Sequence, residues 1–283
     1  MIRRLLVPAA AALLLAGCGG SSSTSGGLPT IQAAKQYELV HFTPASAIVA
    51  GTPVRLSFVV QQPNGQPLTK YKHGPGPHTG VHLIIVRRDL ATIIHTHPPV
   101  APDGTVATTV TFAKPGPYRV VVDVYPQTSG PQANFQLFTT LHVAGAYTPQ
   151  ALPPFSPTDV VDGYRVTMHG TPNLHAIADD YLHLTVTAPN GKPATFTPWF
   201  GAMAHAIFFR RGTLDYFHTH VCSPGQSACA SVVGSTRISG TSTAPGQIKV
   251  GVLVPVGGVW RLFLQFKVDG KVLTAPYTLD VKA

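Results

Sequence analysis

Signatures of several common protein classes are missing from this sequence. Only 11% of its 283 residues are charged, and its 20 Lys and Arg form no basic run or basic helix of the kind that binds nucleic acid. It has no nucleophile elbow, no phosphate-binding loop and no HExxH zinc motif. No window shows helical periodicity, and no apolar run reaches the roughly 20 residues of a membrane-spanning helix. These absences argue against a nucleic-acid partner and against these enzyme classes, and the net charge of +9 suits solubility or contact with an anionic cell envelope.

The N-terminal residues have the order of an export signal. Two arginines precede an apolar run from Leu5 to Ala16, and a glycine and Cys18 follow it. The sequence LAGC resembles the lipobox of bacterial lipoproteins, which implies cleavage before Cys18 and lipidation of that residue. Residues 1–17 are therefore expected to be a lipoprotein signal peptide, and the Gly- and Ser-rich residues 18–34 a flexible tether to the cell membrane or envelope. The alternative is an ordinary secretory signal in which Cys18 is incidental.

Two halves of the sequence repeat each other. The segment LSFVVQQPNGQPLT that begins at Leu56 matches LHLTVTAPNGKPAT at Leu182, including the PNG turn and the next proline. The segment HLIIVRRDLATIIHTHP likewise matches HAIFFRRGTLDYFHTHV, and GPYRVVVDV matches GVWRLFLQF near the end of each half. The tripeptide HTH, which occurs twice, therefore belongs to an internal repeat.

The repeat predicts two domains of like fold. Residues 35–145 and 162–283 are the two units, and the proline-rich residues 146–161 between them predict a semi-rigid linker. In each unit, short runs of Val, Ile, Phe and Thr alternate with turns that contain Gly and Pro. The expected fold is all-β, with two tandem antiparallel β-sandwiches.

The histidines of the first unit lie in a predicted β-hairpin whose turn is the charged RRDL segment. A two-residue turn places His82 directly opposite His95 and Gly80 opposite His97. All three histidines then share one face, because side chains alternate along a strand and opposed residues point to the same side. A turn of odd length would break the cluster, whereas a turn longer by two residues would keep it.

The same register in the second unit adds a thioether to three imidazoles. It places His205 opposite His218 and Met203 opposite His220. Three imidazoles with a thioether favour copper, with methionine suited to Cu(I), and zinc is the other candidate. The sequence thus predicts two metal sites, one in each unit. Their predicted ligands are His82, His95, His97, Met203, His205, His218 and His220.

Other readings of these residues stay open. A His-x-His pair on a strand can be two polar residues on an outward face. Trp199, just before the second hairpin, is a candidate aromatic lid, although it also suits the core. His73 and His78 precede the first hairpin and are either additional ligands or part of a solvated Gly and Pro loop.

Two cysteines lie in a segment that the second unit has and the first lacks. In an exported protein, Cys222 and Cys229 most simply form a local disulfide. Alternatively, the Cys222 thiolate joins His218, His220 and Met203 in a centre of the blue-copper kind. A thiolate ligand and a disulfide exclude each other.

The strand and PNG turn, the two HTH hairpins and the closing strands together resemble bacterial envelope lipoproteins with tandem Ig-like or cupredoxin-like domains. The resemblance implies a His-rich hairpin that binds heavy metal. We therefore expect a membrane-tethered, extracytoplasmic protein that sequesters or delivers copper and is not an enzyme. Its expected partners are the membrane, a metal ion and another envelope protein, but no nucleic acid.

Two alternatives to metal handling stay open. One is a structural Ig-like module that binds an envelope protein or glycan without metal. The other is a zinc hydrolase, which needs a general base. The carboxylates nearest the motifs in sequence, Asp89 and Asp215, lie at the turns and far from the histidines.

Overall fold

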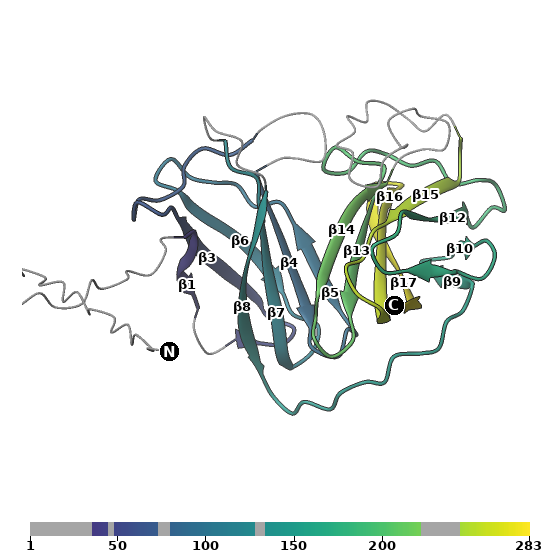
Figure 1. The fold of residues 1–283 in the computed structure, drawn as a ribbon, viewed down its shortest axis with the longest axis horizontal. Coiled ribbons are helices and arrows are strands. Elements are labelled where there is room, and N and C mark those ends of the chain that lie inside the picture. Colours follow the sequence, from purple (N-terminus) through teal and green to yellow (C-terminus); the bar gives the residue numbers. More distant parts are fainter. Residues whose placement is uncertain (1–35, 45–47, 73–79, 128–133, 222–243) are drawn as a thin grey trace, which may run out of the picture. The chain divides into compact units, whose positions relative to one another are not determined.

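Every regular element in the described part of the chain is a β-strand (Figure 1). The computed structural model describes residues 36–44, 48–72, 80–127, 134–221 and 244–283. These residues contain no helix of the length and apolar character needed to cross a membrane. The expected all-β fold is confirmed.

Two sheets form a sandwich in the first repeat. Its strands are β1 (Glu38–Thr43), β2 (Ile48–Val49), β3 (Pro53–Gln61), β4 (Val81–Arg87), β5 (Ile93–Thr96), β6 (Thr105–Thr111), β7 (Gly116–Val124) and β8 (Phe135–Ala144). One sheet has the order β1-β3-β6 and the other β2-β8-β7-β4-β5. Neighbouring strands are antiparallel apart from the short parallel pair of β2 and β8.

The second repeat has a corresponding pair of sheets, with one further strand in the first of them. Its strands are β9 (Thr158–Val161), β10 (Tyr164–Met168), β11 (Leu174–His175), β12 (Asp180–Thr187), β13 (Ala204–Arg210), β14 (Tyr216–Val221), β15 (Gln247–Val252), β16 (Gly258–Val268) and β17 (Lys271–Lys282). The sheet orders are β15-β12-β10-β9 and β11-β17-β16-β13-β14. Strand β9 pairs with β10, so the last residues of the expected linker 146–161 belong to the second sandwich.

Each repeat has its own hydrophobic core between its two sheets. From Leu56 onward, strand β3 alternates between buried and more exposed residues, and β12 does the same from Leu182. This period of two is typical of antiparallel strands with one face on a core. The first core is built around Phe58 and Tyr118, and the second around Phe208 and Trp260.

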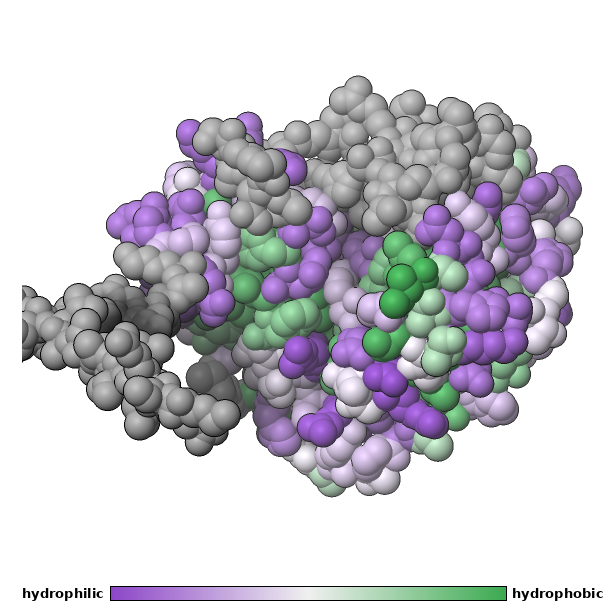
Figure 2. All heavy atoms as spheres, in the orientation of Figure 1, coloured by the Kyte–Doolittle hydropathy of each residue, from purple (hydrophilic) through white to green (hydrophobic). Residues whose placement is uncertain are grey.

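Strands β4 and β13 are buried on both of their faces. All seven residues of β4 are buried, as are the first six of β13. Their second faces pack against each other in a third apolar cluster, which contains residues of both repeats: Ile84, Val86, Leu90, Val121, Ile207, Phe209 and Phe263. Residues 36–283 therefore form one compact unit. On the face of the molecule shown in Figure 2, apolar areas lie between hydrophilic ones.

Candidate metal centre

The first hairpin has its histidines on one face, but in a register shifted from the expected one. Ile84, not His82, is the partner of His95. The shift arises because the turn occupies residues 88–91: the Arg87 amide donates to the Thr92 carbonyl, and Leu90 adopts a φ of 62°. The expected direct pairing of His82 with His95 is therefore wrong. Their common face is retained, because the longer turn keeps the parity.

The second hairpin shows the same shift. His205 pairs with His220, and Ile207 pairs with His218. The expected pairings of His205 with His218 and of Met203 with His220 are therefore wrong. Met203 is 3% exposed and is a member of the apolar core cluster of the second repeat.

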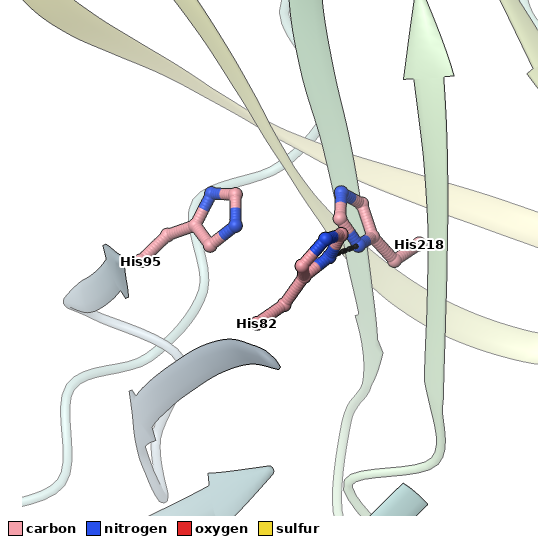
Figure 3. A group of neighbouring side chains, drawn as sticks. All are labelled: His82, His95 and His218. Carbon is pink, nitrogen blue, oxygen red and sulfur yellow. Dashed lines mark hydrogen bonds between the residues drawn. The ribbon is translucent and has the colours of Figure 1, made fainter. Parts of the chain in front are cut away.

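The histidine-bearing faces of the two repeats meet. His82 of β4 lies 3.5 Å from His218 of β14, measured between their Nδ1 atoms (Figure 3). The rings of His95 and His205 have centroids 4.9 Å apart. The expectation of two separate sites is thus corrected to one cluster between the repeats, at the edge of the apolar contact that joins them.

The spacing of the imidazoles suits coordination of a metal ion. The Nε2 atoms of His97 and His95 are 3.2 Å apart, and the Nδ1 atoms of His82 and His218 are 3.5 Å apart. Two nitrogen ligands of a tetrahedral zinc ion, with bonds of 2.0 to 2.1 Å, lie about 3.3 Å apart. Among the described residues, two groups have one ligand atom each within 4.8 Å of the others: His82, His95 and His218, and His95, His97 and His205.

Hydrogen bonds at the edges of the cluster orient two of the rings. Nδ1 of His95 lies 3.0 Å from the side-chain oxygen of Gln265, whose amide nitrogen donates to Thr274. The Gln265 oxygen therefore faces His95 and accepts its proton, which leaves the lone pair on Nε2. On the other side, Nε2 of His205 donates to the Trp199 carbonyl at 3.0 Å, which leaves the lone pair of the neutral ring on Nδ1.

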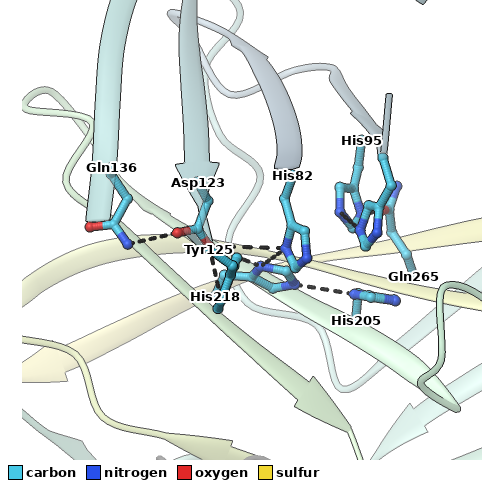
Figure 4. A network of polar contacts seen from close by, with 9 residues as sticks. His82, His95, Asp123, Tyr125, Gln136, His205, His218 and Gln265 are labelled. Carbon is cyan, nitrogen blue, oxygen red and sulfur yellow. Dashed lines mark hydrogen bonds and ion pairs between the residues drawn. The ribbon is translucent and has the colours of Figure 1, made fainter. Parts of the chain in front are cut away.

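Asp123 is a member of the cluster that the sequence analysis missed. It lies on β7 beside His82, is 2% exposed, and has its Oδ2 atom 4.0 Å from Nδ1 of His82 and 4.0 Å from Nδ1 of His218 (Figure 4). Tyr125 donates to Oδ2 and Gln136 donates to Oδ1. The signal was present as a single acidic residue in the apolar strand RVVVDV. The sequence analysis had considered only the carboxylates nearest the HTH motifs along the chain, which are Asp89 and Asp215 at the turns.

Burial keeps three of the imidazoles in their neutral form. Desolvation lowers the pKa of His205 to about 4, and it also lowers the pKa values of His95 and His97, with added repulsion from neighbouring histidines. Desolvation raises the pKa of Asp123 to about 6, although hydrogen bonds to its oxygens oppose this. Neutral imidazole is the form that binds metal.

Two aromatic residues of the second repeat cover the histidines of the first. The ring of Phe200 stacks on His97 with a centroid distance of 3.8 Å and an interplanar angle of 7°, and Trp199 meets the edges of His95 and His205. Phe200 has a φ of 47°, which is unfavourable for a bulky residue, within a tight turn closed by Trp199 and Ala202. Trp199 therefore lies against the histidine rings, as the lid interpretation predicted. Phe200, which the sequence analysis did not name, makes the closer contact, with the ring of His97.

Several residues named in the sequence analysis lie outside the described part of the chain. They are Cys18, His73, His78, Cys222 and Cys229. His220 lies in β14, but its side chain is outside the description. The disulfide, the thiolate alternative and the lipid anchor therefore stay predictions.

Three solved structures illustrate what the chain is similar to. Invasin, a bacterial integrin-binding protein, matches at 13% identity over 88% of this chain and 39% of its own, with a TM-score of 0.24. Domains 4 and 5 of the S-layer protein SbsC match at 12% identity over 88% of this chain and 98% of theirs, with a TM-score of 0.25. A putative membrane anchored protein from Corynebacterium diphtheriae matches at 10% identity over 87% and 57%, with a TM-score of 0.24. Likenesses this weak say nothing about function.

The family relationship is clear by contrast. None of the curated proteins matches the chain. A family model described as a domain of unknown function, DUF8832, matches it twice, at residues 34–147 and 159–283. These two matches cover most of the chain and correspond to the two sandwiches. The chain therefore belongs to the DUF8832 family and carries two copies of its domain.

Proposed function

We propose that the histidine cluster between the repeats binds a divalent transition metal ion, and that the protein sequesters or delivers this metal outside the cytoplasm. The supporting observation is the convergence of five imidazoles from both repeats: His82, His95, His97, His205 and His218. Neutral imidazoles at this spacing can each direct a lone pair to one ion.

Copper is the proposed metal, with zinc as the second candidate. Imidazole ligands suit both ions, and at a given site the affinity order of divalent ions peaks at Cu(II). Met203 is a member of the apolar core, so the proposed ligand set contains no soft thioether to favour Cu(I). We therefore propose Cu(II) binding in place of the Cu(I) preference expected from the sequence.

Burial favours metal handling over catalysis. His82 and His205 are fully buried, and Asp123 is nearly so. A hydrolytic zinc site keeps one open position for water and substrate, which these enclosed side chains do not provide. The export signal and the tether predicted to follow it support an envelope location with attachment through Cys18.

Calorimetric titration of the metal-free full chain with Cu(II) and Zn(II) tests this function. We expect saturable binding and a higher unfolding temperature, because a ligand that binds only the folded state stabilises it by about 2.7 kcal/mol at 100 times its dissociation constant. His82→Gln should weaken binding, whereas His142→Gln, at an exposed position on β8, should not. A chain that binds neither ion and unfolds at the same temperature with and without them would refute the proposal in favour of a structural Ig-like module.

A further inference from the structure

The repeat gives the cluster two corresponding corners, and only one of them carries a carboxylate. In the first repeat, His82 on β4 pairs with Asp123 on β7. In the second repeat, His205 on β13 pairs with Gln265 on β16 at the corresponding register position. Duplication thus produced two equivalent positions that differ in charge.

The histidine of the other repeat completes each corner. His218 lies near Asp123, and His95, its counterpart in the repeat, hydrogen bonds to Gln265. At the Gln265 corner, Nδ1 of His95 carries a proton and donates it to the amide oxygen at 3.0 Å. That nitrogen is therefore committed to a hydrogen bond and is not available to an ion.

At the Asp123 corner the three polar atoms have the spacing of metal ligands. Nδ1 of His82 and Nδ1 of His218 are 3.5 Å apart, and each lies 4.0 Å from Oδ2 of Asp123. Three atoms at these separations share a point about 2.2 Å from each, close to the zinc bond lengths of about 2.0 to 2.2 Å for nitrogen and carboxylate oxygen. An ion can therefore contact all three atoms with little movement of the side chains.

A chain of hydrogen bonds directs the lone pair of His218 into this corner. The Trp199 carbonyl only accepts, so Nε2 of His205 is the donor and Nδ1 of the neutral His205 ring is the acceptor. Nε2 of His218, which is 3.2 Å from that acceptor, must then donate. In neutral His218 the lone pair is consequently on Nδ1, the atom that faces His82 and Asp123. Such outer hydrogen bonds commonly fix the tautomer of metal-binding histidines.

We propose that Asp123 is a metal ligand, and that the ion binds at a mixed site of His82 Nδ1, His218 Nδ1 and Asp123 Oδ2, with His205 as a positioning residue. This inference rests on the proposed metal-binding function. The site takes ligands from both repeats, and its one negative charge suits a divalent cation of borderline softness, such as Cu(II) or Zn(II). The competing position is the group of His95, His97 and His205.

Titration of the full chain and two variants with Cu(II), combined with pulsed electron paramagnetic resonance, distinguishes the two positions. The Asp123 site predicts two copper-bound imidazoles, whereas the competing group predicts three. Asp123→Asn should lower the Cu(II) affinity about 100-fold, in line with the loss of a group that holds the metal. His97→Gln should change it less than about threefold. The metal-free Asp123→Asn chain should still fold, because the substitution removes a buried charge.

The positioning role of His205 is tested by a pair of variants. His205→Leu removes the acceptor for His218 and should lower Cu(II) affinity about 10-fold while two imidazoles stay bound. His205→Asn keeps an acceptor oxygen and should restore most of the affinity. If wild-type protein binds Cu(II) but Asp123→Asn binds it equally well, or three imidazoles are counted, the mixed site is overturned and metal binding stands. If wild-type protein binds no Cu(II), the proposed function itself fails.

Discussion

Acid should destabilise the metal-free protein through its buried histidines. The pKa of His205 is about 4 in the folded state against 6.5 for an exposed histidine, so the unfolded chain binds a proton between these values that the folded chain does not. The stabilisation is therefore complete above pH 6.5 and is lost as the pH falls toward 4. Between pH 7.5 and 5, this one group costs about 2 kcal/mol of the free energy of unfolding. His95 and His97 shift in the same direction.

Asp123 acts with the opposite sign. Its pKa is raised from 3.8 to about 6, so the folded chain holds a proton that the unfolded chain releases. Acidification from pH 7.5 to 5 therefore returns about 1.4 kcal/mol through this carboxyl group. His205 and Asp123 together give a net loss of about 0.6 kcal/mol, and the lowered pKa values of His95 and His97 add to it, so the metal-free chain should be less stable at pH 5 than at pH 7.5.

Urea unfolding of the metal-free chain at the two pH values measures this change, and two variants should move it in opposite directions. His205→Gln should reduce the acid-induced loss by about 2 kcal/mol, whereas Asp123→Asn should increase it by about 1.4 kcal/mol. His142→Gln is the control at an exposed position on β8. A metal-free chain that is equally stable at both pH values, or variants that shift the loss in the same direction, would refute this account.

Three further predictions concern the apolar contact, the aromatic cover and the tether. Ile207→Ala removes a fully buried side chain from the cluster between the repeats and should cost about 2 to 5 kcal/mol in chemical unfolding, with weaker Cu(II) binding as well. Phe200→Asn removes the ring stacked on His97 but keeps a residue type that tolerates positive φ. Release of Cu(II) to a chelator should then become faster while the binding stoichiometry stays the same. An unchanged release rate would show that the ring does not cover the site. Cys18→Ser should move the protein from the membrane fraction to the soluble fraction, and a variant that still sediments would place the anchor elsewhere.

The sequence contained enough to predict the fold and the shared face of each histidine pair. Both follow from the period of two in strands, and every turn of even length keeps the shared face. The exact pairing register, however, depends on the length of the turn. Turns of two and four residues preserve parity, and the chain uses residues 88–91 with Leu90 at positive φ, a conformation for which leucine gives no sequence signal.

Packing of the two repeats against each other could not be derived from the pattern within one repeat. A hint existed in the continuous apolar runs around Ile84 and Ile207, because strands buried on both faces lack polar alternation. The same packing brings in Asp123 and Gln265, which are distant in sequence from the HTH motifs. Candidate ligands chosen by sequence proximity therefore omitted the carboxylate of the centre.

A duplicated motif at an interface has a consequence that a motif within one domain does not have. The proposed ligands His82 and Asp123 come from the first repeat and His218 from the second, so an ion can gain all three contacts only when the repeats are docked. Metal binding and docking are then thermodynamically linked, and each strengthens the other by the same free energy. The apolar contact through Ile84 and Ile207 already holds the two histidine faces together before the ion arrives. Metal binding therefore loses less conformational entropy than it would if the ion had to bring the repeats together. The two corners correspond in the repeat but differ at one position, which is Asp123 in the first repeat and Gln265 in the second. This single difference is enough to place the ion at the Asp123 corner.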